Sequence, residues 1–289
     1  MKPLELIAGE HAVLLLHGLT STPVELQPLA KRLHKAGYSV RAPYFTGYSH
    51  EPGYDAHSVT PWREWQRQVL QELREMKQRY ATVSVGGLCM GAVLALSAAS
   101  EAGDEVDGLI LLATTLYYDG WSIPWYRFVL PLGYYTPFRY FYAYREREPF
   151  GLKNEALRTW VAREMASKTS SIAGAAKLTL PAIHEGELLI RHVKRSLPKV
   201  VVPTLLIHAK EDDVSTLRSA DFVSKHIGSS HVRKVVLLDS YHMITLDNER
   251  ERVADEAIAF LDGVQRHRAA EGAGAAVVSS RPHHGAVSA

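Results

Sequence analysis

The sequence contains a cysteine in the setting of a catalytic nucleophile. Residues 87–91 read GLCMG, so Cys89 has a glycine two positions before it and two positions after it. The preceding run, TVSVG at 82–86, predicts a buried strand, and good helix formers follow at 92–99. A strand, a tight turn and a helix in this order form a nucleophile elbow, in which glycines let the helix and strand approach closely. We therefore expect Cys89 to attack a carbonyl carbon.

A cysteine nucleophile needs a base, and the base needs a carboxylate that orients it. Where a nucleophile elbow occurs, the acid follows a late strand and the histidine comes last in the chain. Asp212 follows an apolar run at 203–208, and His242 follows the last apolar run at 234–238. Ligands bind at the carboxyl ends of such strands. Cys89, Asp212 and His242 are therefore the candidate catalytic residues.

These residues also allow other interpretations. Cys89 is consistent with an inert buried thiol, or with an enzyme that has lost its activity. Asp213, adjacent to Asp212, is an alternative carboxylate. Asp239 lies three residues before His242, and we expect it only to end its strand.

Apolar runs alternate with amphipathic segments along most of the chain. Continuous apolar runs predict strands buried on both faces, and apolar residues at helical spacing predict helices between them. The fold class predicted is therefore α/β, with a mostly parallel central sheet covered by helices on both faces. The expected strands are 12–16, 38–42, 82–86, 108–113, 203–208 and 234–238, and the expected helices are 23–36, 60–79, 92–99, 216–226 and 248–262.

The alternation is interrupted at residues 115–198, which we interpret as an inserted cap. This segment is rich in aromatic residues up to residue 144, and helical stretches follow near 153–166 and 182–195. Most of these aromatic side chains are expected to pack within the cap, and some are expected to line an apolar pocket. The core would then comprise residues 1–114 and 199–262. Residues 263–289 are rich in alanine, glycine, serine and histidine and are predicted to lack regular structure.

The composition excludes several classes of function. The net charge is +2, which gives no electrostatic support for binding nucleic acid or an anionic membrane. One cysteine cannot form an internal disulfide, and the first residues lack the apolar core of a signal peptide, so a cytoplasmic location is expected. The sequence contains no run of about 18 apolar residues, so we expect no transmembrane segment. No HExxH, CxxC or phosphate-loop pattern occurs, so no metal or cofactor is expected.

Several segments together resemble the bacterial carboxylesterases and the monoacylglycerol-lipase-like members of the α/β-hydrolase superfamily. The resemblance covers roughly residues 12–113 and 199–262, whereas the cap matches less well. It implies an α/β-hydrolase fold with cysteine in place of the nucleophilic serine. The matching segments are HGLT at 17–20, AP at 42–43 with Gly47, GLCMG at 87–91, AKEDDV at 209–214 and SYHMITLD at 240–247.

The resemblance implies a role for each candidate residue. Asp212, favoured over its neighbour by the register of the motif, would orient His242, and His242 would deprotonate Cys89. The backbone N–H groups of Leu19 and Met90 would form the oxyanion hole, and Met90 would lie at a helix start, where unpaired donors favour negative charge. Dienelactone hydrolases and polyhydroxyalkanoate synthases also carry cysteine in this elbow.

Two departures from the family pattern bear on the substrate. An acyl-cysteine is a thioester, which amines, thiols and activated alcohols attack readily and water attacks more slowly. We therefore expect a preference for activated esters, thioesters, lactones or acyl transfer. The loop GYSH at 47–50 replaces the glycine-histidine-glycine turn that is frequent in relatives. His17 is expected to brace the oxyanion loop by hydrogen bonds.

The sequence thus predicts a hydrolase of carboxylic ester or thioester bonds that uses a Cys-His-Asp triad and a covalent acyl-cysteine intermediate. An acyltransferase that uses the same intermediate is the first alternative, and a non-catalytic protein that binds small molecules is the second. The expected partners are small acyl esters, thioesters or lactones, and for the transferase also an acyl carrier or acyl acceptor.

Overall fold

The computed structural model describes residues 2–50, 53–167, 170–171, 174–175 and 177–279. Met1, residues 51–52, residues 168–169, 172–173 and 176 of the predicted cap, and residues 280–289 of the predicted tail lie outside the described residues.

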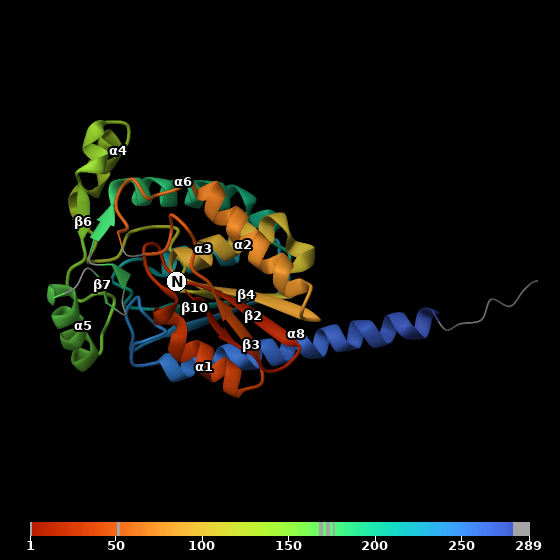
Figure 1. Cartoon of the computed structure of the whole chain (residues 1–289). Helices are drawn as coiled ribbons and strands as arrows, with labels where there is room; N and C mark the ends of the chain where they lie inside the picture. Colours follow the sequence, from red (N-terminus) through yellow and green to blue (C-terminus); the bar gives the residue numbers. More distant parts are fainter. Residues whose placement is uncertain (1, 51–52, 168–169, 172–173, 176, 280–289) are drawn as a thin grey trace, which may run out of the picture.

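A seven-stranded sheet forms the centre of the molecule (Figure 1). Its strands are β1 Leu4–Leu6, β2 His11–Leu16, β3 Ser39–Ala42, β4 Thr82–Leu88, β5 Gly108–Leu112, β10 Thr204–Ala209 and β11 Val232–Leu237. Their order is β1-β3-β2-β4-β5-β10-β11, and every neighbouring pair is parallel except β1 with β3. The prediction of a mostly parallel α/β sheet is therefore confirmed. The short antiparallel edge strand β1 was not predicted.

The apolar runs form strands because helices remove both faces of the sheet from water. Every residue of β2, β5 and β10 is buried. Helices α1 and α8 cover one face, whereas α2 and α3 cover the other, with α6 packed against α3 (Figure 1). The helices of the core are α1 Gln27–Lys35, α2 Trp62–Lys77, α3 Met90–Glu101, α7 Leu217–His226 and α8 Arg250–Ser279.

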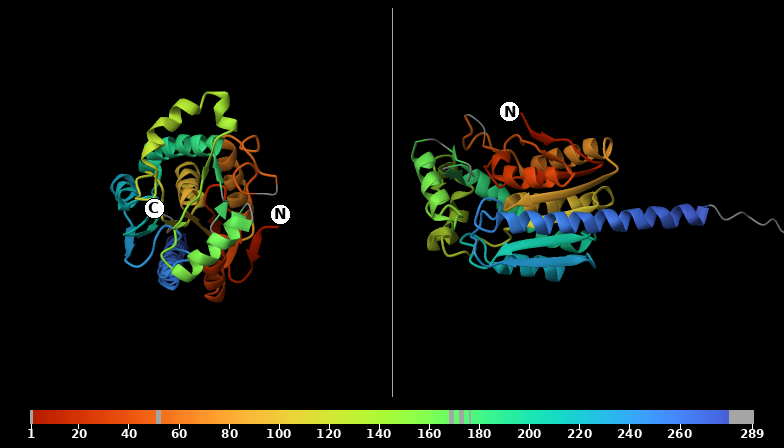
Figure 2. Two further views of the ribbon diagram at one scale, coloured as in Figure 1. Left: turned by 90° about the vertical axis from the view of Figure 1, so that its left-hand side faces the viewer. Right: turned by 90° about the horizontal axis from the view of Figure 1, so that it is seen from below.

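The chain between β5 and β10 leaves the sheet and lies at one end of it (Figure 2). Strands β6 and β9 form a small antiparallel pair, and α6 returns along the core. The elements of this segment are η3 Trp125–Val129, α4 Leu130–Gly133, η4 Pro137–Tyr140, β6 Ala143–Arg145, α5 Glu155–Ser167, β7 Ser170–Ser171, β8 Gly174–Ala175, β9 Lys177–Thr179, α6 Leu180–Ser196 and η5 Leu197–Lys199. We call residues 115–198 the cap.

The last helix is longer than predicted. Helix α8 continues past residue 262, so residues 263–279 are helical rather than without regular structure, and the end of this helix projects from the body (Figures 1 and 2). The composition of 263–279 resembles that of low-complexity segments. Alanine is nevertheless the best helix former, and no proline interrupts the stretch from residue 263 up to Pro282. No helix in the described part of the chain is both long and apolar enough to cross a bilayer.

Candidate active site

Cys89 lies in a strained turn between β4 and α3. Its backbone has φ 58° and ψ −117°, a left-handed conformation that costs energy for any residue other than glycine. Two neighbouring glycines make the turn possible. A Cβ on Gly87 would lie 2.2 Å from the carbonyl carbon of Gly91, and a Cβ on Gly91 would lie 2.1 Å from the carbonyl oxygen of Leu16. Strand and helix therefore approach as closely as a nucleophile elbow requires.

His242 and Asp212 are brought together from two separate loops. The His242 Nδ1 atom lies 2.9 Å and 2.8 Å from the two Asp212 carboxylate oxygens. A carboxylate only accepts hydrogen bonds, so Nδ1 carries the proton. Asp212 is itself held by the backbone N–H groups of Val214, at 2.9 Å, and Ser215, at 2.8 Å. Although burial raises the pKa of the Asp212 carboxyl, the neighbouring His242 brings it below its ordinary value.

The alternative carboxylates lie elsewhere. Asp213 accepts a hydrogen bond from the backbone N–H of His242 at 3.3 Å, and it lines the pocket beside the imidazole. The Asp239 carboxylate instead lies 3.1 Å from the Asn248 amide nitrogen and 3.3 Å from Lys153 Nζ. Of the three, only Asp212 contacts a ring nitrogen of His242, Nδ1.

Cys89 and His242 line one pocket of about 120 Å³. His242 Nε2 makes no hydrogen bond of ordinary geometry within the described residues. Burial lowers the pKa of His242, but the charges of Asp212 and Cys89 outweigh burial and raise this pKa well above its ordinary value. The raised pKa makes the His242 imidazole a stronger base than a free one. The Cys89 sulfur also lies 3.4 Å from the Thr115 hydroxyl.

The loop that follows β2 is braced through His17. His17 Nδ1 lies 2.8 Å from the Gly18 carbonyl oxygen, so this nitrogen carries the proton, and Nε2 accepts a hydrogen bond from the Ser49 hydroxyl at 2.7 Å. Burial lowers the pKa of His17 to about 4, which keeps the ring neutral. The Tyr48 hydroxyl donates to the His17 carbonyl oxygen at 2.7 Å. The unusual residues of the 47–50 loop therefore position the oxyanion loop.

The backbone N–H groups of Leu19 and Met90 have no partner among the described residues, and both residues line the catalytic pocket. Met90 is the first residue of α3, where the helix dipole favours negative charge. Both groups are thus available as hydrogen-bond donors in this pocket.

Glu25 is a buried carboxyl under the same loop that the sequence did not single out. It accepts hydrogen bonds from the Gly18 N–H at 2.6 Å and from the Ser21 hydroxyl. Burial raises its pKa to about 7. A glutamate at the start of a helix is ordinary in a sequence, so only the fold reveals that this one is buried beside the site.

Glu146 on the cap is a second carboxyl that sequence reasoning missed. It lines the pocket together with Asp213 and Tyr118. Burial, and next to it the charge of Asp213, raise the pKa of Glu146 to about 7. The cap therefore adds an acidic side chain to a pocket that residues of the core also line.

An apolar cavity of about 90 Å³ adjoins the catalytic pocket under the cap. Tyr118, Tyr144 and Leu178 line both spaces. Tyr126 and Tyr142 also line the cavity, so several cap aromatics form the apolar lining expected from the sequence.

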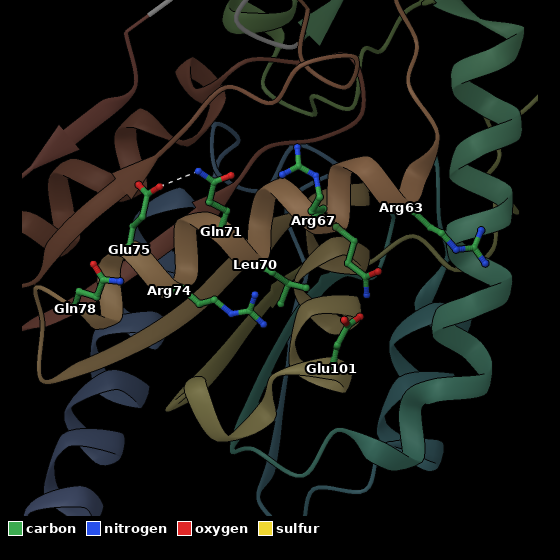
Figure 3. Close-up of a pocket in the computed structure, with 9 residues that line it drawn as sticks. Arg63, Arg67, Leu70, Gln71, Arg74, Glu75, Gln78 and Glu101 are labelled. Atoms are coloured by element: carbon green, nitrogen blue, oxygen red, sulfur yellow. Dashed lines mark hydrogen bonds between the residues drawn. The ribbon is translucent and has the colours of Figure 1, made fainter.

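A larger hollow of about 640 Å³ lies along α2 and shares no lining residue with the catalytic pocket (Figure 3). Two of its three arginines have carboxylate partners, Arg67 with Glu64 and Arg74 with Glu105 at 3.3 Å, and Arg63 lies over the Trp62 ring. It holds neither cysteine nor histidine, so we interpret it as a solvated helix face.

The parallel sheet, the strained elbow and the late histidine define an α/β-hydrolase. The family described as "Serine aminopeptidase, S33" matches residues 9–250, and the chain belongs to this family. The chain is an enzyme of the carboxylesterase- and lipase-like type within these hydrolases.

The relatives include lipases and esterases. A thermostable monoacylglycerol lipase of Bacillus sp. (strain H-257) is 29% identical over 252 residues, which cover 87% of this chain and 90% of the relative. A carboxylesterase of Bacillus subtilis (strain 168) is 23% identical over 262 residues, or 90% of this chain and 96% of the relative. The structure of a metagenome-derived lipolytic enzyme superposes with a TM-score of 0.74 at 25% identity, covering 92% of this chain and 98% of that chain.

Proposed function

We propose that the protein hydrolyses small carboxylic esters or thioesters through an acyl-cysteine at Cys89. The observation that supports this most is the geometry around Cys89. Cys89 has a positive φ at the elbow and shares one pocket with His242, and the Nδ1 atom of His242 is hydrogen-bonded to Asp212. The names of the relatives, a monoacylglycerol lipase and a carboxylesterase, support an ester substrate.

The reaction begins when the Cys89 sulfur attacks the substrate carbonyl carbon and the thiol proton moves to His242 Nε2. The backbone N–H groups of Leu19 and Met90 stabilise the resulting oxyanion, and one such donor contributes about 3 kcal/mol. The tetrahedral intermediate collapses, the C–O or C–S bond breaks, and His242 gives its proton to the leaving alcohol or thiol. The acyl group remains on Cys89 as a thioester.

A water molecule then attacks the acyl-cysteine and loses a proton to His242. Collapse of the second intermediate returns that proton to the sulfur and releases the carboxylic acid. When an alcohol, amine or thiol replaces the water, the same steps transfer the acyl group. The cysteine favours this second outcome because a thioester reacts readily with amines and thiols.

Steady-state turnover of a short neutral ester and its matching thioester tests the proposal. Cys89→Ala is expected to lower kcat/KM by about 10⁴-fold or more, as removal of a nucleophile does. Cys89→Ser serves as the control, because it keeps a nucleophile in the elbow. Addition of butylamine then separates hydrolysis, which yields only the acid, from transfer, which yields the amide. Turnover by Cys89→Ala equal to that of the unmodified protein would contradict the proposal.

A further inference from the structure

A separate hollow of about 310 Å³ opens on the surface between α6, α7 and the chain that follows β5. It adjoins the catalytic pocket, because Tyr118 lines both spaces. Arg127 in turn lines both this hollow and the apolar cavity under the cap. A group bound in the hollow would therefore be separated from the catalytic pocket by the Tyr118 side chain.

Basic side chains outnumber acidic ones in this hollow. Glu187 is shared by two arginines, lying 2.9 Å from Arg127 and 3.7 Å from Arg191. Lys194 makes no ion pair with a carboxylate in the parts of the chain that the structure describes. The charged lining consists of four cations, Arg127, Arg191, Lys194 and Arg218, and two carboxylates, Asp119 and Glu187.

One aromatic ring holds two of these cations close together. Lys194 Nζ lies 3.5 Å from the centroid of the Tyr117 ring, and Arg218 Cζ lies 4.0 Å from the same centroid. The ring stabilises each cation, but the cations repel one another. Burial, together with the charges of Arg218 and Arg127, lowers the pKa of Lys194. A bound anion would relieve this repulsion and satisfy the ammonium donors that no carboxylate meets.

We propose that this hollow is a binding site for a phosphate dianion. The lining carries two more positive than negative charges, which matches the charge of about −2 on a phosphate monoester. Lysine and arginine are the side chains that bind phosphate most often, lysine as a point charge and arginine as a planar fork. The larger hollow along α2 has an excess of only one positive charge, because its lining holds three arginines, Arg63, Arg67 and Arg74, and two carboxylates, Glu75 and Glu101 (Figure 3).

The phosphate has two possible sources. It is either free phosphate, or the phosphate of a thioester substrate whose acyl end enters the neighbouring catalytic pocket. Assigning the phosphate to a thioester substrate rests on the proposed function, whereas the existence of the phosphate site does not.

Titration calorimetry with inorganic phosphate tests the site without any assay of activity. Lys194→Gln is expected to weaken phosphate binding by about tenfold, the usual loss for one charge-assisted hydrogen bond. Lys225→Gln is the matched control, because it removes the same charge from an exposed position on α7 outside the hollow. Arg218→Gln provides a second test if Lys194→Gln melts early. No saturable phosphate binding by the unmodified protein, or equal binding by Lys194→Gln, would overturn the proposal.

Kinetics then identify the source. The ratio of kcat/KM for a phosphate-bearing thioester to kcat/KM for its neutral, truncated counterpart is measured in the unmodified protein and in Lys194→Gln. A drop of about tenfold in this ratio assigns the phosphate to the substrate. An unchanged ratio with weakened calorimetric binding assigns the site to free phosphate. If neither thioester is turned over, the thioester part of the proposed function fails and the substrate is excluded as the source, and the calorimetry still decides whether the site exists.

Discussion

His242 and Asp212 on the core are 4% and 2% exposed, whereas Trp125 and Phe141 on the cap are 82% and 84% exposed. The core residues are held by several hydrogen bonds in the loops that follow β10, which is fully buried, and the edge strand β11. The cap wall rests on two three-residue strands and short helical turns. From this difference we propose that the core fixes the chemistry before substrate binds, and that the cap controls which acyl group and leaving group fit.

The largest effect is expected for the imidazole of the core. His242→Ala should lower kcat/KM by about 10⁴-fold, because it removes the imidazole proposed to take the thiol proton of Cys89. His226→Ala, which removes an exposed histidine of α7, is the control and should leave turnover unchanged. A loss of less than tenfold for His242→Ala in an ester hydrolysis assay would remove this residue from the proposed mechanism.

The buried carboxyl under the oxyanion loop should make stability depend on pH. The pKa of Glu25 is 4.5 as a free side chain and about 7 in the fold. Between these pH values the folded state keeps a proton that the unfolded state has released, so the free energy of unfolding falls as pH rises. Between pH 4.5 and 7.5 the unmodified protein should lose about 3 kcal/mol of its free energy of unfolding through Glu25. Glu25→Gln should not show this decrease. Urea denaturation of both proteins measures it, and parallel pH profiles would contradict the assignment.

The close approach at the elbow should tolerate no side chain. Gly91→Ala is expected to lower the free energy of unfolding by about 1–3 kcal/mol, because its Cβ would overlap the Leu16 carbonyl oxygen. Gly263→Ala in α8 is the matched control, since no atom lies within 4 Å of the position of its Cβ. The control should be neutral or slightly stabilising in urea denaturation. Equal effects of the two substitutions would show that the elbow is looser than described.

The cap should alter selectivity with little change in the chemical step. Leu178 on β9 lines both the catalytic pocket and the apolar cavity, and Leu178→Trp should fill part of the space between them. KM for long-chain esters is expected to rise by about tenfold, whereas kcat for an acetyl ester should stay within about twofold. A parallel loss of kcat on both esters would mean that the cap also positions the catalytic groups.

The elements of the core could be predicted because burial imposes a simple pattern. The apolar run predicted at 12–16 forms β2, and the run at 203–208 forms β10, each within one residue, because a strand covered on both faces admits few polar residues. The cap strands were not predicted, since three residues show no periodicity. The end of α8 was missed because composition outweighed the helix propensity of alanine.

The candidate active site could be predicted only in part, because a sequence shows local patterns and not the contacts made by tertiary packing. The order of Cys89, Asp212 and His242 follows from the strands that they terminate, and the structure brings Asp212 and His242 into contact. Glu25 and Glu146 became neighbours of the site through tertiary packing. No local pattern distinguishes such a carboxylate from a solvated one.

The most direct measurement of the central claim is the mass of the protein after brief mixing with an activated acyl ester at neutral pH. The protein should gain one acyl group that maps to the peptide containing Cys89, the only cysteine of the chain. This adduct should be absent in Cys89→Ala and much slower to form in His242→Ala. An adduct that persists in Cys89→Ala, or that maps to another residue, would contradict the account.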